Sequence, residues 1–143
     1  MLWLARHTDE DLDHVLEKES GLLGLCGTGD MREVLRRSDD GDPAAAMAVD
    51  VYVHRLVTSL TACVGELGGL DVLVFTGGVG ENAGRLREIV AARLEWLGVR
   101  LAKTGVDIGG SIELTGPGAA VRTFVIGARE DLQMSAEVTD LLD

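Results

Sequence analysis

The spacing of apolar residues changes along the chain, and each change marks an expected element. From Pro43 to Leu67 apolar residues recur every three or four positions, which predicts a helix about 37 Å long. Asp42 and Pro43 fit its start, and Gly68 and the glycine after it fit its end. The helix carries so many apolar residues that we expect it to be covered on more than one side.

Residues 72–75 form an apolar run without alternation, which predicts a buried parallel strand. A second buried strand is expected over residues 121–126. Residues 20–30 are glycine-rich and are expected to form a connection. Further helices are expected over residues 9–19, from a cap at Asp30 to about residue 37, from the glycine segment after residue 77 to Gly98, and over residues 130–142. The order predicts an α/β fold with a parallel core. Because sheets usually hold about four to six strands, we expect strands to be missing or supplied by another chain.

Composition narrows the function classes. The chain of 143 residues is 46% hydrophobic and 3% aromatic, so an aliphatic core is expected. A net charge of -11 disfavours nucleic-acid binding, because the protein would repel phosphate backbones. No uninterrupted apolar run reaches the ~20 residues that span a bilayer, so we expect no membrane partner and a cytoplasmic location. Cys26 and Cys63 show no metal spacing, and Cys63 is expected to be buried.

The segment GVGENA, residues 78–83, matches the G-x-G-x-x-G/A fingerprint of dinucleotide-binding folds. Such folds place an acidic residue about 20 positions further on, where this chain has Arg100 and Lys103. We therefore do not favour an NAD site. Two interpretations stay open: a turn with a structural role only, and a loop at the carboxyl end of a parallel strand where another ligand binds.

Three segments resemble the acetate kinase family. They are VFTGGVGENAGRLRE (74–88), SGLLGLCGTGDMREV (20–34) and FVIGAREDLQMSAE (124–137), and their order and spacing agree with the family. Butyrate and propionate kinases are close relatives and are not separated from it by these residues. The chain departs from the family pattern at Cys26, where a serine is usual, and at residues 126–129, which lack the usual Pro-Thr before the acidic pair.

The resemblance implies a partial actin-like ATPase (ribonuclease H-like) lobe with parallel strands and flanking helices. Residues 1–129 would be an incomplete C-terminal nucleotide-binding lobe, and residues 130–143 a helix that packs on an N-terminal lobe absent from this chain. The implied reaction transfers phosphate between ATP and acetate, or another short carboxylate, with ATP/ADP and Mg²⁺. The family's catalytic groups lie in the absent lobe, so we assign no catalytic residue and expect the chain alone to be inactive. Because the family dimerises through this lobe, a homo-oligomer is expected.

The resemblance also implies roles for single residues. Those expected to line the adenosine pocket are Gly78, Val79, Gly80, Glu81 and Asn82.

Asp30 would accept the ribose hydroxyls, Met31 would contribute its backbone, and Arg32 would lie against the base or sugar. Glu130 would help to hold Mg²⁺ through water, and Asp131 could share that role. Simpler interpretations stay open. Asp30 could be a helix cap only, Arg32 a solvated residue, and Glu130 the start of the last helix. The alternative function is a non-enzymatic domain that binds nucleotide or self-associates.

Overall fold

A computed structural model describes residues 6–7, 11–102, 111–129 and 138. The chain divides into two compact units, Met1–Leu60 and Thr61–Asp143. The boundary expected between residues 129 and 130, and most of the helix expected over residues 130–142, lie outside the described residues. Both therefore stay predictions.

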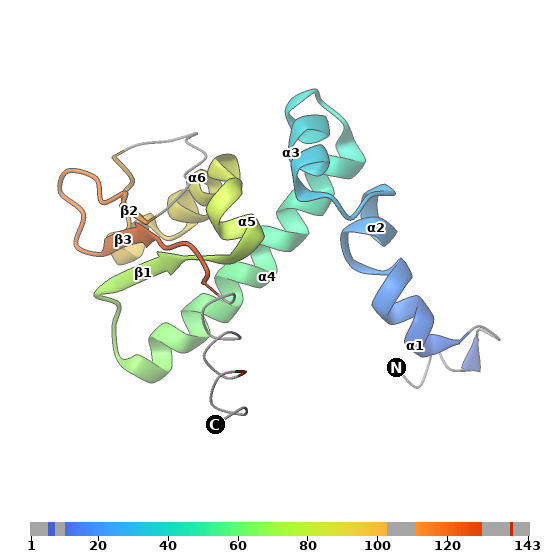
Figure 1. The fold of residues 1–143 in the computed structure, drawn as a ribbon, viewed down its shortest axis with the longest axis horizontal. Coiled ribbons are helices and arrows are strands. Elements are labelled where there is room, and N and C mark those ends of the chain that lie inside the picture. The colour runs from blue at the N-terminus through green and yellow to red at the C-terminus, as the bar shows by residue number, and fades with distance from the viewer. Residues whose placement is uncertain (1–5, 8–10, 103–110, 130–137, 139–143) are drawn as a thin grey trace. The chain divides into compact units, whose positions relative to one another are not determined.

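Unit 1 is helical. It contains α1 (Leu12–His14), the π-helical turn η2 (Val15–Glu19), α2 (Gly21–Cys26), α3 (Met31–Asp39) and most of α4 (Pro43–Leu67) (Figure 1). Asp11 caps α1, because its Oδ1 accepts a hydrogen bond from the backbone N–H of Asp13 at 3.1 Å. The prediction that residues 20–30 form only a connection is wrong, since α2 lies there. Its three leucines favour helix, and Gly27, at φ +79°, ends it.

Helix α4 begins as predicted, because Asp42 Oδ1 accepts from the backbone N–H groups of Ala44 (2.9 Å) and Ala45 (3.3 Å). The expectation that it is covered on several sides is wrong. Its buried residues form one stripe of small side chains near its start: Ala45, Ala48, Val49 and Val53. Cys63 is exposed rather than buried. By length and composition alone α4 could cross a bilayer, although core helices of soluble proteins meet the same test.

Unit 2 is built on a three-stranded sheet in the order β1-β3-β2. The predicted strands β1 (Val72–Phe75) and β3 (Arg122–Val125) pair in parallel, with Phe75 opposite Val125. The expected all-parallel core is only partly confirmed, because β2 (Ile112–Glu113) runs antiparallel to β3. A short connection between neighbouring strands leaves no room for the crossover that a parallel pair requires. Residues 99–101 add two isolated bridges, from Val99 to Val121 and from Leu101 to Thr115.

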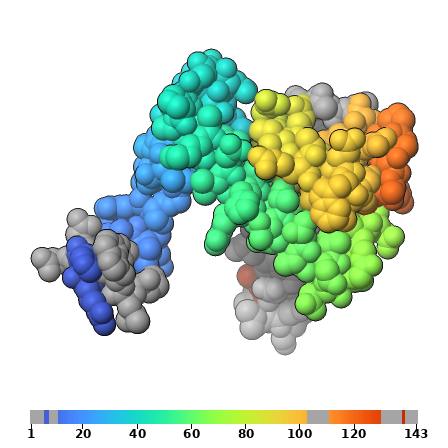
Figure 2. Space-filling model, turned by 180° about the vertical axis from the view of Figure 1, so that it is seen from behind, coloured from blue at the N-terminus to red at the C-terminus, as the bar shows by residue number. Residues whose placement is uncertain are grey.

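The core of unit 2 lies between one face of the sheet and α6 (Gly84–Arg93), with the short 3₁₀ helix η3 (Glu95–Leu97) after it. The buried apolar residues alternate on the strands and recur at helical spacing on the helix: Leu73, Val121 and Val125, with Leu86, Val90 and Leu94. From behind, the segment of α6 and η3 lies beside that of β2 and β3 (Figure 2). Val72 and Val74 point to the opposite face and are exposed, so the expectation that residues 72–75 form a buried strand holds for one face of β1 only.

Candidate functional site

The glycine segment after β1 is a single short helix, α5 (Gly77–Asn82), rather than the expected loop. The residue before it, Thr76, is extended, and Gly77 then takes φ +74°. This left-handed conformation, which glycine adopts without steric cost, lets the chain pass directly from strand to helix. The fingerprint glycines therefore open a helix at the carboxyl end of a parallel strand, as expected for a ligand-binding turn in an α/β sheet.

The two glycines of the fingerprint have different surroundings. A Cβ at Gly80 would lie 3.3 Å from the carbonyl carbon of Phe75, so Gly80 allows α5 to pack closely on the end of β1. A Cβ at Gly78 would meet no atom within 4 Å, so one face of the turn is open at Gly78. Asn82 is exposed, and its Nδ2 donates to the Gly78 carbonyl at 2.9 Å. Val79 is half-buried. Gly78 therefore combines exposure with an accessible backbone.

The Glu81 carboxylate accepts hydrogen bonds from the protein backbone. Its Oε1 accepts from the backbone N–H of Gly77 at 2.9 Å and from that of Ala128 at 2.8 Å. Gly77 follows β1 and Ala128 follows β3, so one oxygen joins the segments that continue two neighbouring strands. This contact was not foreseen from the sequence, which assigned Glu81 only to the pocket lining.

Arg87, which sequence analysis did not single out, binds the backbone of the glycine turn. Its guanidinium donates from Nη1 to the carbonyls of Gly80 (2.7 Å) and Glu81 (2.8 Å), and the residue is only 2% exposed. A signal was present, because Arg87 shares its helix face with the buried Val90 and Leu94. An arginine on a buried face requires hydrogen-bond acceptors, and here backbone carbonyls supply them.

The second group of predicted residues lies in unit 1, at the start of α3. Asp30 is the N-cap, as predicted, because its Oδ1 accepts from the backbone N–H of Arg32 at 2.9 Å. Its other carboxylate oxygen has no hydrogen-bond partner among the described residues. The Arg32 side chain is 82% exposed, and its Nε lies 3.8 Å from Asp30 Oδ1. Met31 is buried. Capping occupies one oxygen of Asp30 and leaves the other for a ligand.

Arg37 fixes α3 against its neighbours in unit 1. Its Nε and Nη2 donate to Asp42 Oδ2 at 2.8 and 2.6 Å, and its Nη1 donates to the Cys26 carbonyl at 2.8 Å. Hydrogen bonds from Arg37, and then from the backbone N–H of Ala45, hold the pKa of the Asp42 carboxyl below its ordinary value. The end of α2, the last turn of α3 and the start of α4 thus meet at one guanidinium.

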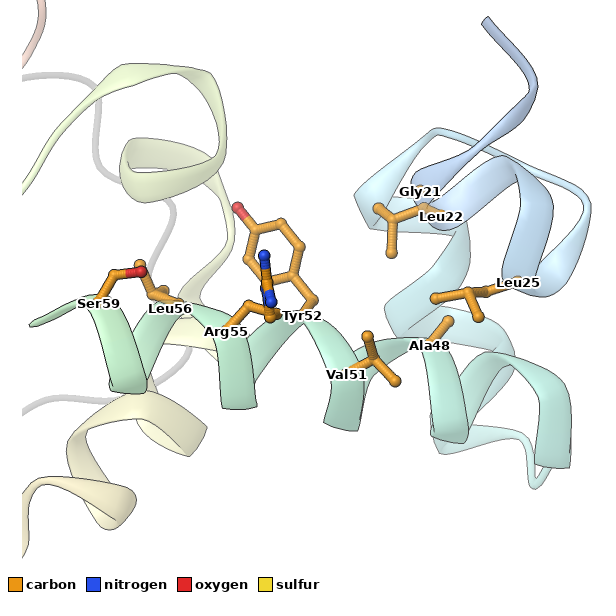
Figure 3. A pocket seen from close by; sticks show the side chains of 9 residues that line it. All are labelled: Gly21, Leu22, Leu25, Ala48, Val51, Tyr52, Arg55, Leu56 and Ser59. Atoms are coloured by element: carbon orange, nitrogen blue, oxygen red, sulfur yellow. The ribbon is translucent and has the colours of Figure 1, made fainter. Parts of the chain in front are cut away.

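Unit 1 also contains an apolar groove of about 620 Å³ between α2 and α4, which sequence analysis missed (Figure 3). Its lining is mostly aliphatic, with three polar side chains from α4: Tyr52, Arg55 and Ser59. None of the predicted site residues lines it. The groove is an apolar surface separate from the start of α3.

The predicted metal ligand, Glu130, lies outside the described residues, so its role stays a prediction. Within the part of the chain that the structure describes, no three His, Cys, Asp or Glu side chains gather as metal ligands would.

The fold and the glycine turn define an α/β protein with a candidate ligand site at the carboxyl end of the parallel strand β1. The sequence matches the Acetokinase family over residues 1–136, and the chain belongs to this family. It is 42% identical to the acetate kinase of Clavibacter michiganensis over 144 residues, covering 94% of this chain and 35% of the relative. It is 38% identical to that of Streptomyces coelicolor over 135 residues, covering 93% and 33%.

Solved structures of the family agree with the fold. The crystal structure of Porphyromonas gingivalis acetate kinase matches 99% of this chain and 37% of its own chain, with a TM-score of 0.84 and 27% identity. That of a propionate kinase from Francisella tularensis matches 93% and 35%, with a TM-score of 0.81 and 29% identity. The resemblance drawn from the three segments is confirmed. The chain spans about a third of the length of these relatives.

Proposed function

We propose that this chain is the nucleotide-binding C-terminal part of an acetate kinase, and that alone it does not transfer phosphate. The parent reaction would convert ATP and acetate, or another short carboxylate, to ADP and the acyl phosphate. The observation that carries this proposal is the open face of the turn at Gly78, at the carboxyl end of β1, in a chain of the Acetokinase family. A cytoplasmic location and the partial actin-like lobe belong to the same proposal.

The residues at the turn suit an adenosine. With no side chain at Gly78, a flat base can approach the backbone closely. Val79 is half-buried and offers an apolar contact to one face of the base. The exposed Asn82 keeps its side-chain oxygen as an acceptor, because its hydrogen bond to the Gly78 carbonyl uses Nδ2.

The residues at the start of α3 suit a ribose. The second carboxylate oxygen of Asp30 can accept from ribose hydroxyls while the first keeps its capping bond. The Arg32 guanidinium is exposed and planar, and it can stack on a base or sugar. Met31 is buried, so its contribution would come from the backbone.

Mg²⁺ would arrive with the nucleotide. This ion prefers one or two carboxylates together with phosphate oxygens and water, so a single carboxylate such as Glu130 is enough only when phosphates supply the other ligands. When bound, the ion would neutralise charge on the phosphates. We therefore expect Mg²⁺ alone to bind weakly to this chain.

The proposed inactivity follows from the length matched. The chain covers 35% of the acetate kinase that it matches at 42% identity, so most of a full-length relative has no counterpart here. Phosphoryl transfer depends on positioning and on charge stabilisation around the transferred group, which a nucleotide site alone does not supply. An acyl-phosphate assay should detect no turnover with pure chain, and any turnover that tracks the purified protein would contradict this.

The binding proposal is tested by NMR titration of labelled chain with Mg-ADP. Saturable shifts are expected at the amides of Gly77, Gly78 and Gly80, and at Asp30 and Arg32. AMP without Mg²⁺ serves as a control for adenosine contacts alone. A well-dispersed spectrum that does not change at high Mg-ADP would contradict nucleotide binding by this chain.

Self-association is the second candidate function, and exposed apolar side chains favour it. Leu67 is 76% exposed and Trp96 is 70% exposed, and Val72 and Val74 on β1 are exposed as well. Large exposed apolar side chains often mark interaction sites. We expect a dimer or larger assembly by light scattering, and a clean monomer of about 15 kDa would contradict it.

A further inference from the structure

We propose that Glu81 is a positioning residue that joins the segments after β1 and β3 into one rigid platform, and that it does not contact the nucleotide itself. The proposal deepens the function above, and its ligand part rests on that function. Its structural part stands on the contacts of unit 2 alone.

The two segments start from one edge of the sheet. β1 and β3 are parallel neighbours, so their carboxyl ends lie side by side (Figure 1). The ladder extends one residue past β3, because the backbone N–H of Ile126 donates to the Phe75 carbonyl at 2.9 Å. Beyond that bond, Glu81 Oε1 accepts from Gly77 on one side and Ala128 on the other. The carboxylate thus continues the connection between the strands after the backbone pairing ends.

The backbone of Glu81 is itself held in place by Arg87. Arg87 donates to the carbonyl of Glu81 and to that of Gly80, and Gly80 packs closely on the end of β1. A carboxylate fixed in this way needs little reordering to hold two backbone N–H groups. Hydrogen bonds to a charged acceptor are also stronger than those to a neutral one.

Both bonds of the platform end on the same oxygen, Oε1, and the other oxygen, Oε2, faces the segment after β3, where a Cβ at Gly127 would lie 3.7 Å from it. Glu81 would therefore affect a nucleotide by fixing the turn that presents Gly78. Ala128 precedes the predicted metal ligand Glu130 by two residues. One side chain thus ties the turn proposed for adenosine to the segment that follows β3.

Amide hydrogen exchange tests the platform without any ligand. Glu81→Ala should speed exchange at both Gly77 and Ala128 by roughly tenfold to a hundredfold, as loss of a bond to a charged acceptor predicts. Glu81→Gln keeps an acceptor oxygen and should give a smaller change at both amides. Glu95→Ala is the matched control, since Glu95 is an exposed glutamate of the same unit. Unchanged exchange at Ala128 in Glu81→Ala, with a folded spectrum, would overturn the platform.

Titration with Mg-ADP then separates positioning from contact. Glu81→Ala should weaken binding by roughly tenfold, and Glu81→Gln by less than about threefold, because it retains the acceptor. Equal weakening in both variants, while Glu81→Gln keeps its amides protected, would show direct contact and overturn the proposed role. Failure of the unsubstituted chain to bind Mg-ADP, with exchange behaving as expected, would refute the proposed function and leave the platform supported.

Discussion

Arg37 in unit 1 and Arg87 in unit 2 each link separate pieces of chain, and they do so in different surroundings. Arg37 is half-buried and binds the carboxylate of Asp42 through two nitrogens, together with one backbone carbonyl. Arg87 is 2% exposed and donates to two backbone carbonyls of α5. The first link therefore includes a titratable partner near solvent, whereas the second is buried and includes two backbone carbonyls.

The same difference between an exposed and a buried setting separates the two groups of predicted site residues, one in each unit. In unit 1, Asp30 and Arg32 lie at an exposed helix start, where their side chains face solvent. In unit 2, the turn presents backbone, and the charged side chains around it, Glu81 and Arg87, hold that backbone in place. Charged residues of the predicted site segments are thus exposed in unit 1 and used as structural links in unit 2.

Removing the buried arginine, Arg87, should have the largest effect on stability. Arg87→Ala leaves two carbonyls of α5 without their donor in a buried setting, and should lower the free energy of unfolding by about 2–4 kcal/mol. Urea denaturation measures it. Arg85→Ala is the matched control on the same helix, because Arg85 is exposed, and should change stability by less than about 0.5 kcal/mol. Equal losses of stability in the two variants would contradict the expectation that the buried arginine contributes more than the exposed one.

Two glycines of unit 2 allow a second comparison, between a glycine required by close packing and one on the open face of the turn. At Gly98, φ is +90° and a Cβ would lie 2.6 Å from Ala120 Cβ, so Gly98→Ala should cost about 2 kcal/mol of stability. Gly78→Ala should cost less than about 0.5 kcal/mol, since no atom lies within 4 Å. The same Gly78 variant should still weaken Mg-ADP binding, because its methyl group lies on the open face of the turn. Thermal unfolding and titration together check both outcomes.

Thr123 offers a smaller effect of the opposite sign. It is fully buried in β3, and its Oγ1 has no hydrogen-bond partner among the described residues. Thr123→Val removes that unpaired oxygen and should stabilise the chain by about 1 kcal/mol in urea denaturation. A loss of stability would mean that the hydroxyl has a bonding role in solution.

The smallest effect concerns the exposed link of unit 1. A lowered pKa means that Asp42 contributes stability above its ordinary pKa of 3.8, and this is lost as pH falls through the lowered value. Carboxyl titration by NMR should therefore give Asp42 a midpoint below 3.8. Arg37→Gln should move that midpoint upward, because the hydrogen bond from Arg37 is the main cause of the lowering. An Asp42 midpoint that does not change in Arg37→Gln would contradict the proposed effect of the ion pair on the Asp42 pKa.

Local chemistry made several elements predictable. Asp30 and Asp42 cap their helices as expected, since a short acidic side chain reaches the first N–H groups of the following turn in any fold. The apolar runs became β1 and β3. Other expectations failed where distant neighbours decide the outcome. Helix α4 has apolar residues on several faces, but only packing determined that Cys63 stays exposed.

The amino-acid sequence by itself determined the starts of α3 and α4, the two parallel strands, the glycine turn and the family, because each depends on residues close together along the chain. The tertiary structure alone decided the direction of β2, the groove of unit 1 and the partners of Glu81. Glu81 and Ala128 are 47 positions apart, and they meet because two parallel strands end at the same edge of a sheet. A contact of that kind leaves no periodic signal in a sequence, since it depends on which strands become neighbours.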